Sequence, residues 1–507
     1  MANITRFPRA LAIFTISIAQ TSHAADWKVT PHAHASETYS DNLTLAGPNQ
    51  EIGDFISEVT PGINLQETGS RTKASLDYSL QRLSYKNQNR LDHVYSHLVT
   101  MGEADLIEKS MFLDANASIS QQPISLNAAI GANNSNPTGN IVNVATWSLS
   151  PYLKHRFGSA AQGEIRFTHQ AQSYSSGGPS NTGIGTLSNS TNNSMKFALS
   201  SGTMFNNLLW GLSYNNSKIG YTARPDSRLT DYSASIGYIF TPKFKIMLTG
   251  GNENNSYVYI GAKPQGAYWS TEATWAPTSH TKVSVAMGQR YFGKTQSMTL
   301  NHVTRLTSLQ AAYSQDVTAG VLQQSMTPAA VLDQLLKAQI PNNAARQQAV
   351  QSMLASLGTQ AALLGQSITT NQVYLHKKFT TTMGINLPKS IIVLTAFSSS
   401  SSSLEQGGSF LQGSVNYGAV NQQGGTASWN WQISPKLSSN ISATLTAFDF
   451  PGQNLKENSS LYLFGLTRKF AHGMSGNISY RRQAFDSNPA ILNYAENAII
   501  ASLSYQN

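Results

Sequence analysis

Hydrophobic and polar residues alternate with a period of two along most of this chain, and the stretch 232–250 shows the pattern best. Serine and glycine occupy its polar face, apart from one apolar exception, Ile239. The tripeptide Thr241–Lys243 then reverses the chain, and the alternation resumes. This pattern predicts two half-buried antiparallel strands joined by a tight turn. The apolar face comprises Tyr232, Ala234, Ile236, Tyr238, Phe240, Phe244, Ile246 and Leu248.

Similar alternating runs recur about twenty times, each of roughly 9–13 residues, which suits tilted membrane strands better than ordinary strands. Their connections alternate between short and long, as in outer-membrane barrels with short periplasmic turns and longer external loops. The chain is therefore predicted to be all-β: a transmembrane antiparallel up-and-down barrel of about 18–22 strands. Apolar side chains should face lipid, and Thr241–Lys243 should be a periplasmic turn. The predicted long loops are 36–54, 122–145, 175–192, 254–265 and 398–425.

Strand counting is inconsistent at one place. Strands can be counted from the N-terminus or from the C-terminus, with every short turn placed on the periplasmic side. The two counts disagree by one strand around residues 371–399. Either Val373–Met383 is not a membrane strand, or the sidedness of the loops fails there. The loops are rich in glycine, serine and asparagine, and the run Ser398–Ser403 is predicted to be flexible and solvated. Aromatic residues near strand ends, including Phe448 and Phe450, suggest interfacial girdles, although aromatics also favour strands in general.

One segment, residues 320–366, breaks the alternation. Thr327–Gln339 has a threonine N-cap, proline at the first helical position and apolar residues at helical spacing. Residues 343–357 repeat that signal after Pro341, so the segment is predicted to be a short helical hairpin. It could be an appendage on the solvent side, a plug in the lumen or an interfacial membrane helix.

The N-terminus resembles a secretory signal peptide. Arg6 and Arg9 precede a short apolar run, Ala10–Ala19, which is too short to span a bilayer as a helix. Small residues at Ser22 and Ala24 suit a cleavage site. We therefore expect residues 1–24 to be a leader and residues 25–507 to form the outer-membrane barrel.

Composition agrees with a barrel rather than a soluble domain. Charged residues make up 12% of the 507 residues, about half the usual share, and apolar residues make up 40%. Such a chain can surround a neutral polar lumen with an apolar exterior. The absence of cysteine excludes lipoprotein acylation, thiolate zinc sites and disulfide frameworks. The net charge of +9 comes without a basic cluster, so nucleic acid is not an expected partner.

No catalytic, cofactor-binding or metal-binding residues can be assigned from the sequence, and an enzyme is not expected. His32 and His34 form the closest histidine pair, and on a strand they would share one face. They could contact a metal ion, but neither a cysteine nor a nearby carboxylate completes a coordination shell, so solvated or lumen histidines are the simpler interpretation. No nucleotide-binding loop or paired catalytic carboxylates stand out.

Four short motifs carry a resemblance to a known family: 37–45 (ETYSDNLTL), 56–63 (ISEVTPGI), 288–293 (GQRYFG) and 312–318 (AYSQDVT). In this order they resemble the PEP-CTERM system-associated outer-membrane protein family. That family is similar to the EpsL-type barrels encoded with exopolysaccharide genes in exosortase-bearing Gram-negative bacteria. The resemblance implies an outer-membrane location and a link to exopolysaccharide production or export.

Two functions remain open. The first is a porin-like channel or export component for polysaccharide or another polar solute, because neutral polar side chains offer hydrogen bonds without strong charge selectivity. The second is a non-conducting structural or assembly barrel of the PEP-CTERM/exosortase system. Outer-membrane lipid is the expected partner in both cases, with polysaccharide and periplasmic export components as further candidates.

Overall fold

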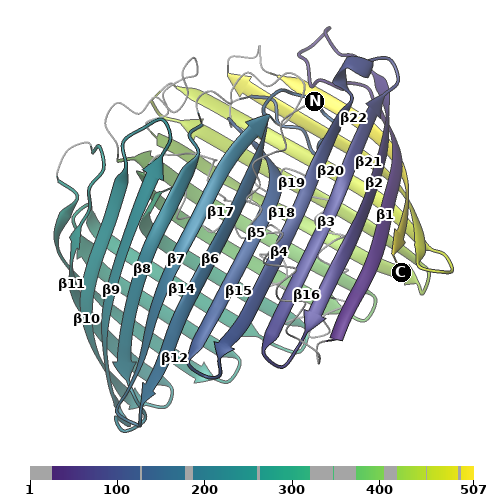
Figure 1. The fold of residues 1–507 in the computed structure, drawn as a ribbon. Coiled ribbons are helices and arrows are strands. Elements are labelled where there is room, and N and C mark those ends of the chain that lie inside the picture. Colours follow the sequence, from purple (N-terminus) through teal and green to yellow (C-terminus); the bar gives the residue numbers. More distant parts are fainter. Residues whose placement is uncertain are drawn as a thin grey trace.

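The computed structural model is an antiparallel β-barrel (Figure 1). It describes residues 26–125, 128–176, 187–259, 263–319, 346, 373–404, 419–452, 454–488 and 493–506. The described residues form 22 strands, each paired with its neighbours in sequence, and the last strand pairs with the first from His32↔Gln506 to Ser40↔Ala498. Closure removes the unpaired strand edges that lipid could not satisfy. The predicted all-β barrel is confirmed, with a strand number at the upper end of the expected range.

The strands are mostly 10–17 residues long, and one short 3-10 helix, η1, lies between β3 and β4. Their bounds are β1 Asp26–Ser40, β2 Asp54–Thr68, β3 Thr72–Tyr85, η1 Asn89–Leu91, β4 His93–Ile107, β5 Met111–Pro123, β6 Ile141–Phe157, β7 Ala161–Ser176, β8 Ser190–Ser201, β9 Leu208–Tyr221, β10 Ser227–Thr241, β11 Phe244–Asn254, β12 Gln265–Thr278, β13 Thr281–Arg290, β14 Gly293–Val303, β15 Thr307–Ala319, β16 Val373–Leu387, β17 Ser390–Ser403, β18 Ala419–Ser434, β19 Leu437–Phe450, β20 Leu455–Lys469, β21 Met474–Asn488 and β22 Tyr494–Gln506.

The hairpin at 232–250 folds as its alternation predicts. β10 and β11 pair around the two-residue turn at Pro242 and Lys243. Ile236 is 55% exposed on the outer face, and its neighbours Tyr232, Tyr238 and Phe240 are exposed beside it. The intervening serines and Ile239 lie half-buried on the inner face. An apolar exterior around a closed barrel is the arrangement that a lipid bilayer requires.

Short and long connections lie at opposite ends of the barrel. The connections after the even-numbered strands are short, whereas most connections after the odd-numbered strands are long. One exception is the two-residue turn at Tyr291 and Phe292, which joins β13 to β14 at the long-loop end. Val373–Met383 belongs to a strand, β16. The inconsistent strand count around residues 371–399 therefore does not come from a missing strand there.

The expectation that Ser398–Ser403 forms a flexible loop is wrong. These six serines end β17, and their backbones pair with β16 on one side and β18 on the other. A strand needs only backbone partners on both sides, and small serine side chains suit its inner and outer faces equally. The predicted loop 398–425 shrinks to 404–418, and the loop 122–145 likewise shrinks to 124–140.

Two expectations fall on residues that the structure does not describe. The predicted leader, residues 1–24, lies outside the described residues. The predicted helical hairpin, residues 320–366, also lies outside them except for Arg346. Both stay predictions. No helix among the described residues is long and apolar enough to cross a membrane.

Candidate solute pathway and its inward-folded loops

The inner wall of the barrel is lined by neutral polar side chains that bond across neighbouring strands. Ser213 Oγ lies 2.7 Å from Ser233 Oγ, between β9 and β10. Asn440 donates to Asn430 at 2.7 Å between β18 and β19. These pairs leave lone pairs and protons for water or a polar solute. The lining thus matches the predicted polar lumen.

The inner face of β12–β15 forms one exposed sector of the wall, and inward residues elsewhere, such as His97 and Met101 on β4, are exposed as well. Glu272 on β12, Ser297 on β14 and Ser314 on β15 lie on the inner face, and each of them is exposed. On the same strands, Trp269, Met298 and Tyr313 lie on the outer face. In a ring of 22 strands, β13 lies across the barrel from β2. The exposed sector therefore faces the wall formed by the first strands.

Apolar residues change face near the long-loop end. In β19 the outward residues as far as Ala447 are apolar except for Ser439, and the inward residues from Ser438 to Thr446 are all polar. Beyond this point the outward residue is Asp449, whereas inward Phe448 and Phe450 are only 2% and 1% exposed. Their assignment to a lipid-facing aromatic girdle is therefore wrong. β3 and β9 change in the same way, with Leu83, Tyr85 and Ile219 buried on the inside.

The β5–β6 connection folds into the barrel and covers Phe448 and Phe450. Ile219 packs instead against Tyr257 and Val373. We call residues 128–140 of the β5–β6 connection the mouth loop. Asn140 links the two ends of the connection, because its Nδ2 donates to Ser125 O at 2.8 Å and its Oδ1 accepts from Ser125 N at 2.9 Å. A Cβ on Gly131 would lie 2.7 Å from Asn136 Cβ, so the loop can close on itself only with glycine there. The mouth loop is a compact element rather than an extended flap.

The mouth loop reaches strands that are distant from its own. Ile130 packs with Val420, Phe448, Phe450 and Leu455, which belong to β18, β19 and β20. The hydroxyl of Tyr494 on β22 donates to Ile130 O at 3.2 Å and accepts from Ile130 N at 3.4 Å. Since β5 and β6 lie on the other side of β1, the loop crosses part of the barrel mouth.

A buried polar network holds the tip of the mouth loop. Glu496 accepts from Arg481 Nη2 at 2.9 Å, from Ser40 Oγ at 2.7 Å and from Asn136 Nδ2 at 2.9 Å. Asn136 Nδ2 also donates to Leu43 O at 3.2 Å. The Arg481 and Glu496 side chains are 3% and 0% exposed. An ion pair this deep needs its extra hydrogen bonds, and the mouth loop supplies two of them, since Asn136 Oδ1 also accepts from Arg481 Nη2 at 3.4 Å.

The β1–β2 connection, residues 41–53, folds inward beside the mouth loop. Leu43 is fully buried against Ile56, Leu83, Tyr85 and Tyr95. The hydroxyl of Tyr85 donates to Ser135 O at 3.1 Å, which links this cluster to the mouth loop. Two connections therefore cover the inner wall from β18 through β1 to β4.

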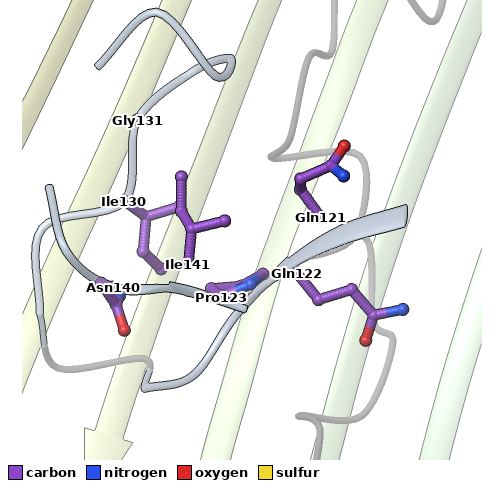
Figure 2. A pocket seen from close by; sticks show the side chains of 7 residues that line it. All are labelled: Gln121, Gln122, Pro123, Ile130, Gly131, Asn140 and Ile141. Carbon is purple, nitrogen blue, oxygen red and sulfur yellow. The ribbon is translucent and has the colours of Figure 1, made fainter. Parts of the chain in front are cut away.

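Little space remains where the mouth loop meets its own strands. Figure 2 shows Ile130, Gly131 and Asn140 of the loop around a cavity that is completed by the ends of β5 and β6. Its volume is about 10 Å³, which is room for about one water molecule. Gln121 and Gln122 carry their amide groups away from Ile130 (Figure 2). The contact between the mouth loop and its own strands is therefore closed to anything larger than a water molecule.

Charged groups mark the facing wall of the mouth. Arg290, at the end of β13, donates to both oxygens of Glu253 at 2.9 and 2.5 Å and to Asp316 Oδ1 at 2.5 Å. The Glu253 side chain is 1% exposed, whereas that of Asp316 is 65% exposed. Nearby, burial and a 2.9 Å hydrogen bond with Tyr257 raise the pKa of Tyr291, in the β13–β14 turn. This wall therefore presents a cation and an exposed carboxylate to the lumen.

A second charged group lies nearer the short-turn end. Arg166 on β7 bonds to Asp114 at 2.6 Å and to Glu164 at 3.0 Å. Its guanidinium also stacks 3.7 Å from the ring of Tyr152, which in turn stacks on Phe112. The group contains both signs of charge, so it provides a polar and aromatic surface without a strong single-sign field.

The two histidines considered as metal ligands lie on the inner face of β1. His34 Nδ1 lies 2.9 Å from Ser504 Oγ. The ring of His32 covers Gly62, whose added Cβ would lie 2.2 Å from Nε2. The part of the chain that the structure describes contains no group of three or more histidine, aspartate or glutamate residues placed to hold a metal ion.

Sequence reasoning identified no site residues, and the residues of the mouth were missed. Asn136 lies 345 positions before Arg481 and 360 before Glu496, and nothing near Asn136 marks it. A usable signal did exist in the strands, because apolar residues move to the polar face in β3, β9 and β19. Such an inversion indicates that the inner wall is covered at that level.

Neither the known family models nor the curated proteins match this chain. Among solved structures, it is similar to the siderophore receptor PirA from Pseudomonas aeruginosa, with 8% identity over 95% of this chain and 80% of that chain and a TM-score of 0.47. It is also similar to the ferric citrate transporter FecA in its unliganded form, with 9% identity, 94% and 78% coverage and a TM-score of 0.44. OpdK from Pseudomonas aeruginosa, solved with vanillate, matches with 9% identity, 95% and 99% coverage and a TM-score of 0.37. These TM-scores lie below 0.5, so the function is argued from this chain's own residues.

Proposed function

We propose that this protein is an outer-membrane channel for polar solutes, narrowed at its external mouth by its own loops. The mouth loop carries this proposal: it crosses towards β18–β22 while the inner face of β12–β15 stays exposed. A wide barrel that fills one side of its mouth retains a passage along the other. The apolar exterior and the short-turn end suit a bacterial outer membrane, with the short turns in the periplasm.

The lining supports a neutral or weakly charged solute. Serine, threonine, asparagine and glutamine dominate the inner wall, and charged groups such as Arg166 and Arg290 are paired with carboxylates. Sugars are recognised by hydrogen bonds and by aromatic surfaces of the kind that Tyr152 and Phe112 provide. With the family resemblance, this favours polysaccharide linked to exopolysaccharide production or export.

A non-conducting assembly barrel is the second candidate. It is favoured by the apolar clusters around Leu43 and Ile130, which fill part of the mouth as a protein core would. In that case the barrel would serve the PEP-CTERM/exosortase system as a platform, with periplasmic export components as partners.

Single-channel conductance in planar bilayers separates the two candidates. The wild type is compared with a variant lacking residues 128–139, and with a control in which residues 222–226, at the same end, are replaced by a short glycine turn. A channel should conduct, and loss of the mouth loop should raise its conductance while the control leaves it unchanged. A further variant lacking residues 320–366 tests the predicted insert. Absence of conductance in every form would refute the channel.

A further inference from the structure

Basic residues gather at the short-turn end of the barrel. All ten connections at this end are described, and they contain six lysines and arginines but one carboxylate, Glu108. We call the six cations the basic collar. They are Arg71, Lys109, Lys243, Arg305, Lys389 and Lys436, and all six are exposed.

The opposite end has no such excess. Leaving aside the β15–β16 connection, which is described only at Arg346, the described residues of the long-loop connections contain four cations and four carboxylates. The cations there are Lys86, Arg90, Arg224 and Lys263, and the carboxylates are Asp41, Glu51, Asp92 and Asp226. The basic collar is therefore a property of one end rather than of the whole chain.

Three collar lysines share one local structure. Pro242-Lys243, Pro388-Lys389 and Pro435-Lys436 are each a two-residue turn between paired strands. Proline fixes φ at the first turn position, which leaves lysine at the tip. The three turns lie after β10, β16 and β18, so they occupy separate points around the barrel rim.

Each of these turns contacts the next strand beside an exposed ring. Lys243 O accepts from Ala276 N, which follows Trp275. Lys389 O accepts from Gln432 N, which follows Trp431, and Lys436 O accepts from Lys469 N, which precedes Phe470. Trp275, Trp431 and Phe470 are 53%, 40% and 46% exposed. Outward aromatic rings of this kind lie at the boundary between hydrocarbon and headgroups, so the adjacent lysines reach headgroup level.

These cations are available for a partner. Lys243, Arg305, Lys389 and Lys436 form no ion pair within the described residues, whereas Lys109 pairs with Glu108. Arg71 donates to the carbonyls of Asp105 and Leu106, which also orients its guanidinium at the rim. Unpaired cations at headgroup level attract anionic lipid, and each contributes about fivefold in association at moderate ionic strength.

We propose that the basic collar binds the phosphate groups of anionic phospholipids in the leaflet that faces the short turns. The turns present a ring of phosphate-binding cations around the barrel just outside its aromatic rim. This proposal rests on the membrane placement given above, but not on conductance. It assigns a lipid class to one leaflet and gives the barrel an electrostatic anchor at that side.

The test uses full-length protein in phosphatidylcholine vesicles that contain spin-labelled phosphatidylglycerol or phosphatidylcholine. The association constants of the two labelled lipids are compared by electron spin resonance. The wild type should prefer phosphatidylglycerol several-fold at 0.1 M salt, and the preference should fall at 1 M salt because the Debye length shrinks from about 10 to about 3 Å. Conductance is recorded from the same preparations, so that a failed channel and a failed collar give different results.

The decisive variant replaces the three turn lysines: Lys243→Gln, Lys389→Gln and Lys436→Gln. The control makes the same charge change at the long-loop end, with Lys86→Gln, Lys263→Gln and Lys294→Gln. The first variant should lose at least half of the preference, and the control should keep it. Equal association of the two lipids with the wild type, or equal loss in both variants, overturns the proposal. If the wild type binds the two lipids equally, an acidic periplasmic protein becomes the alternative partner for the basic collar.

Discussion

Replacing Arg481 with methionine should release the mouth loop. The substitution leaves Glu496 buried without its cation, since that carboxylate is 0% exposed. Removing one partner of a buried ion pair costs about 3–5 kcal/mol. The barrel can avoid this cost if the loop undocks, because Asn136 then withdraws and water hydrates Glu496. A change of this size shifts the docking equilibrium by roughly two to four orders of magnitude.

The assay is single-channel recording of Arg481→Met in planar bilayers. We expect higher mean conductance and frequent large fluctuations compared with the wild type. Retention of the folded barrel is checked by its heat-dependent electrophoretic mobility in detergent. Exposure of the loop is checked independently by limited proteolysis within residues 128–140, which should become faster.

The double variant Arg481→Met/Glu496→Gln isolates the role of charge. Glutamine keeps an oxygen that can accept from Ser40 and Asn136, and neutral replacement of a buried pair is often close to neutral in stability. The double variant should therefore conduct more like the wild type than Arg481→Met does. Wild-type conductance in Arg481→Met, or equal disturbance in both variants, would refute the account of the network.

Three further predictions concern other parts of the barrel. Tyr494→Phe removes the hydroxyl that bonds Ile130 and should weaken loop docking by about 1 kcal/mol, seen as faster proteolysis of the mouth loop and as conductance noise without loss of the barrel. Ile236→Lys on the outer face should cost about 2–4 kcal/mol in urea unfolding from vesicles, whereas Ser235→Lys, next to it on the inner face, should cost less than 1 kcal/mol; equal costs would contradict the assigned faces. Arg290→Gln leaves Glu253 and Asp316 without their cation and should shift the reversal potential in a potassium chloride gradient towards cation selectivity, and an unchanged potential would place Arg290 away from the solute path.

The wall of the barrel could be predicted from sequence because the polarity of each strand residue matches the side of the wall that it faces. Ile236 and Ser235 differ in polarity since one side of the wall meets lipid and the other meets the lumen. Turns such as Pro242-Lys243 are equally local, because proline and its neighbour determine the reversal. Strand existence and face therefore followed from a few residues at a time.

The mouth could not be predicted in this way. The mouth loop contains small and polar residues that are typical of any solvated loop, and its anchors depend on strands far along the chain. Tyr494 is more than 360 positions from Ile130. The prediction for the serine run 398–403 was wrong for a related reason. Serine is common in loops, but backbone pairing with β16 and β18 makes this run part of a strand. Long-range pairing overrode local preference in both cases.

The point at which apolar residues change face also measures the membrane. Counted from the short turns to the last polar inward residue before this change, β3 contributes Thr72–Gln81, β9 contributes Leu208–Ser217 and β19 contributes Leu437–Thr446, which are 10 residues each. A tilted membrane strand needs about 9–11 residues. The remainder of each strand therefore lies beyond the bilayer at the long-loop end. At this level the outer face no longer contacts lipid, so its residues can be polar. The inner face packs against the inward-folded loops, so its residues are apolar. The change of face explains why Phe448 and Phe450 were wrongly predicted to face lipid. It also indicates where the membrane ends and where the mouth begins.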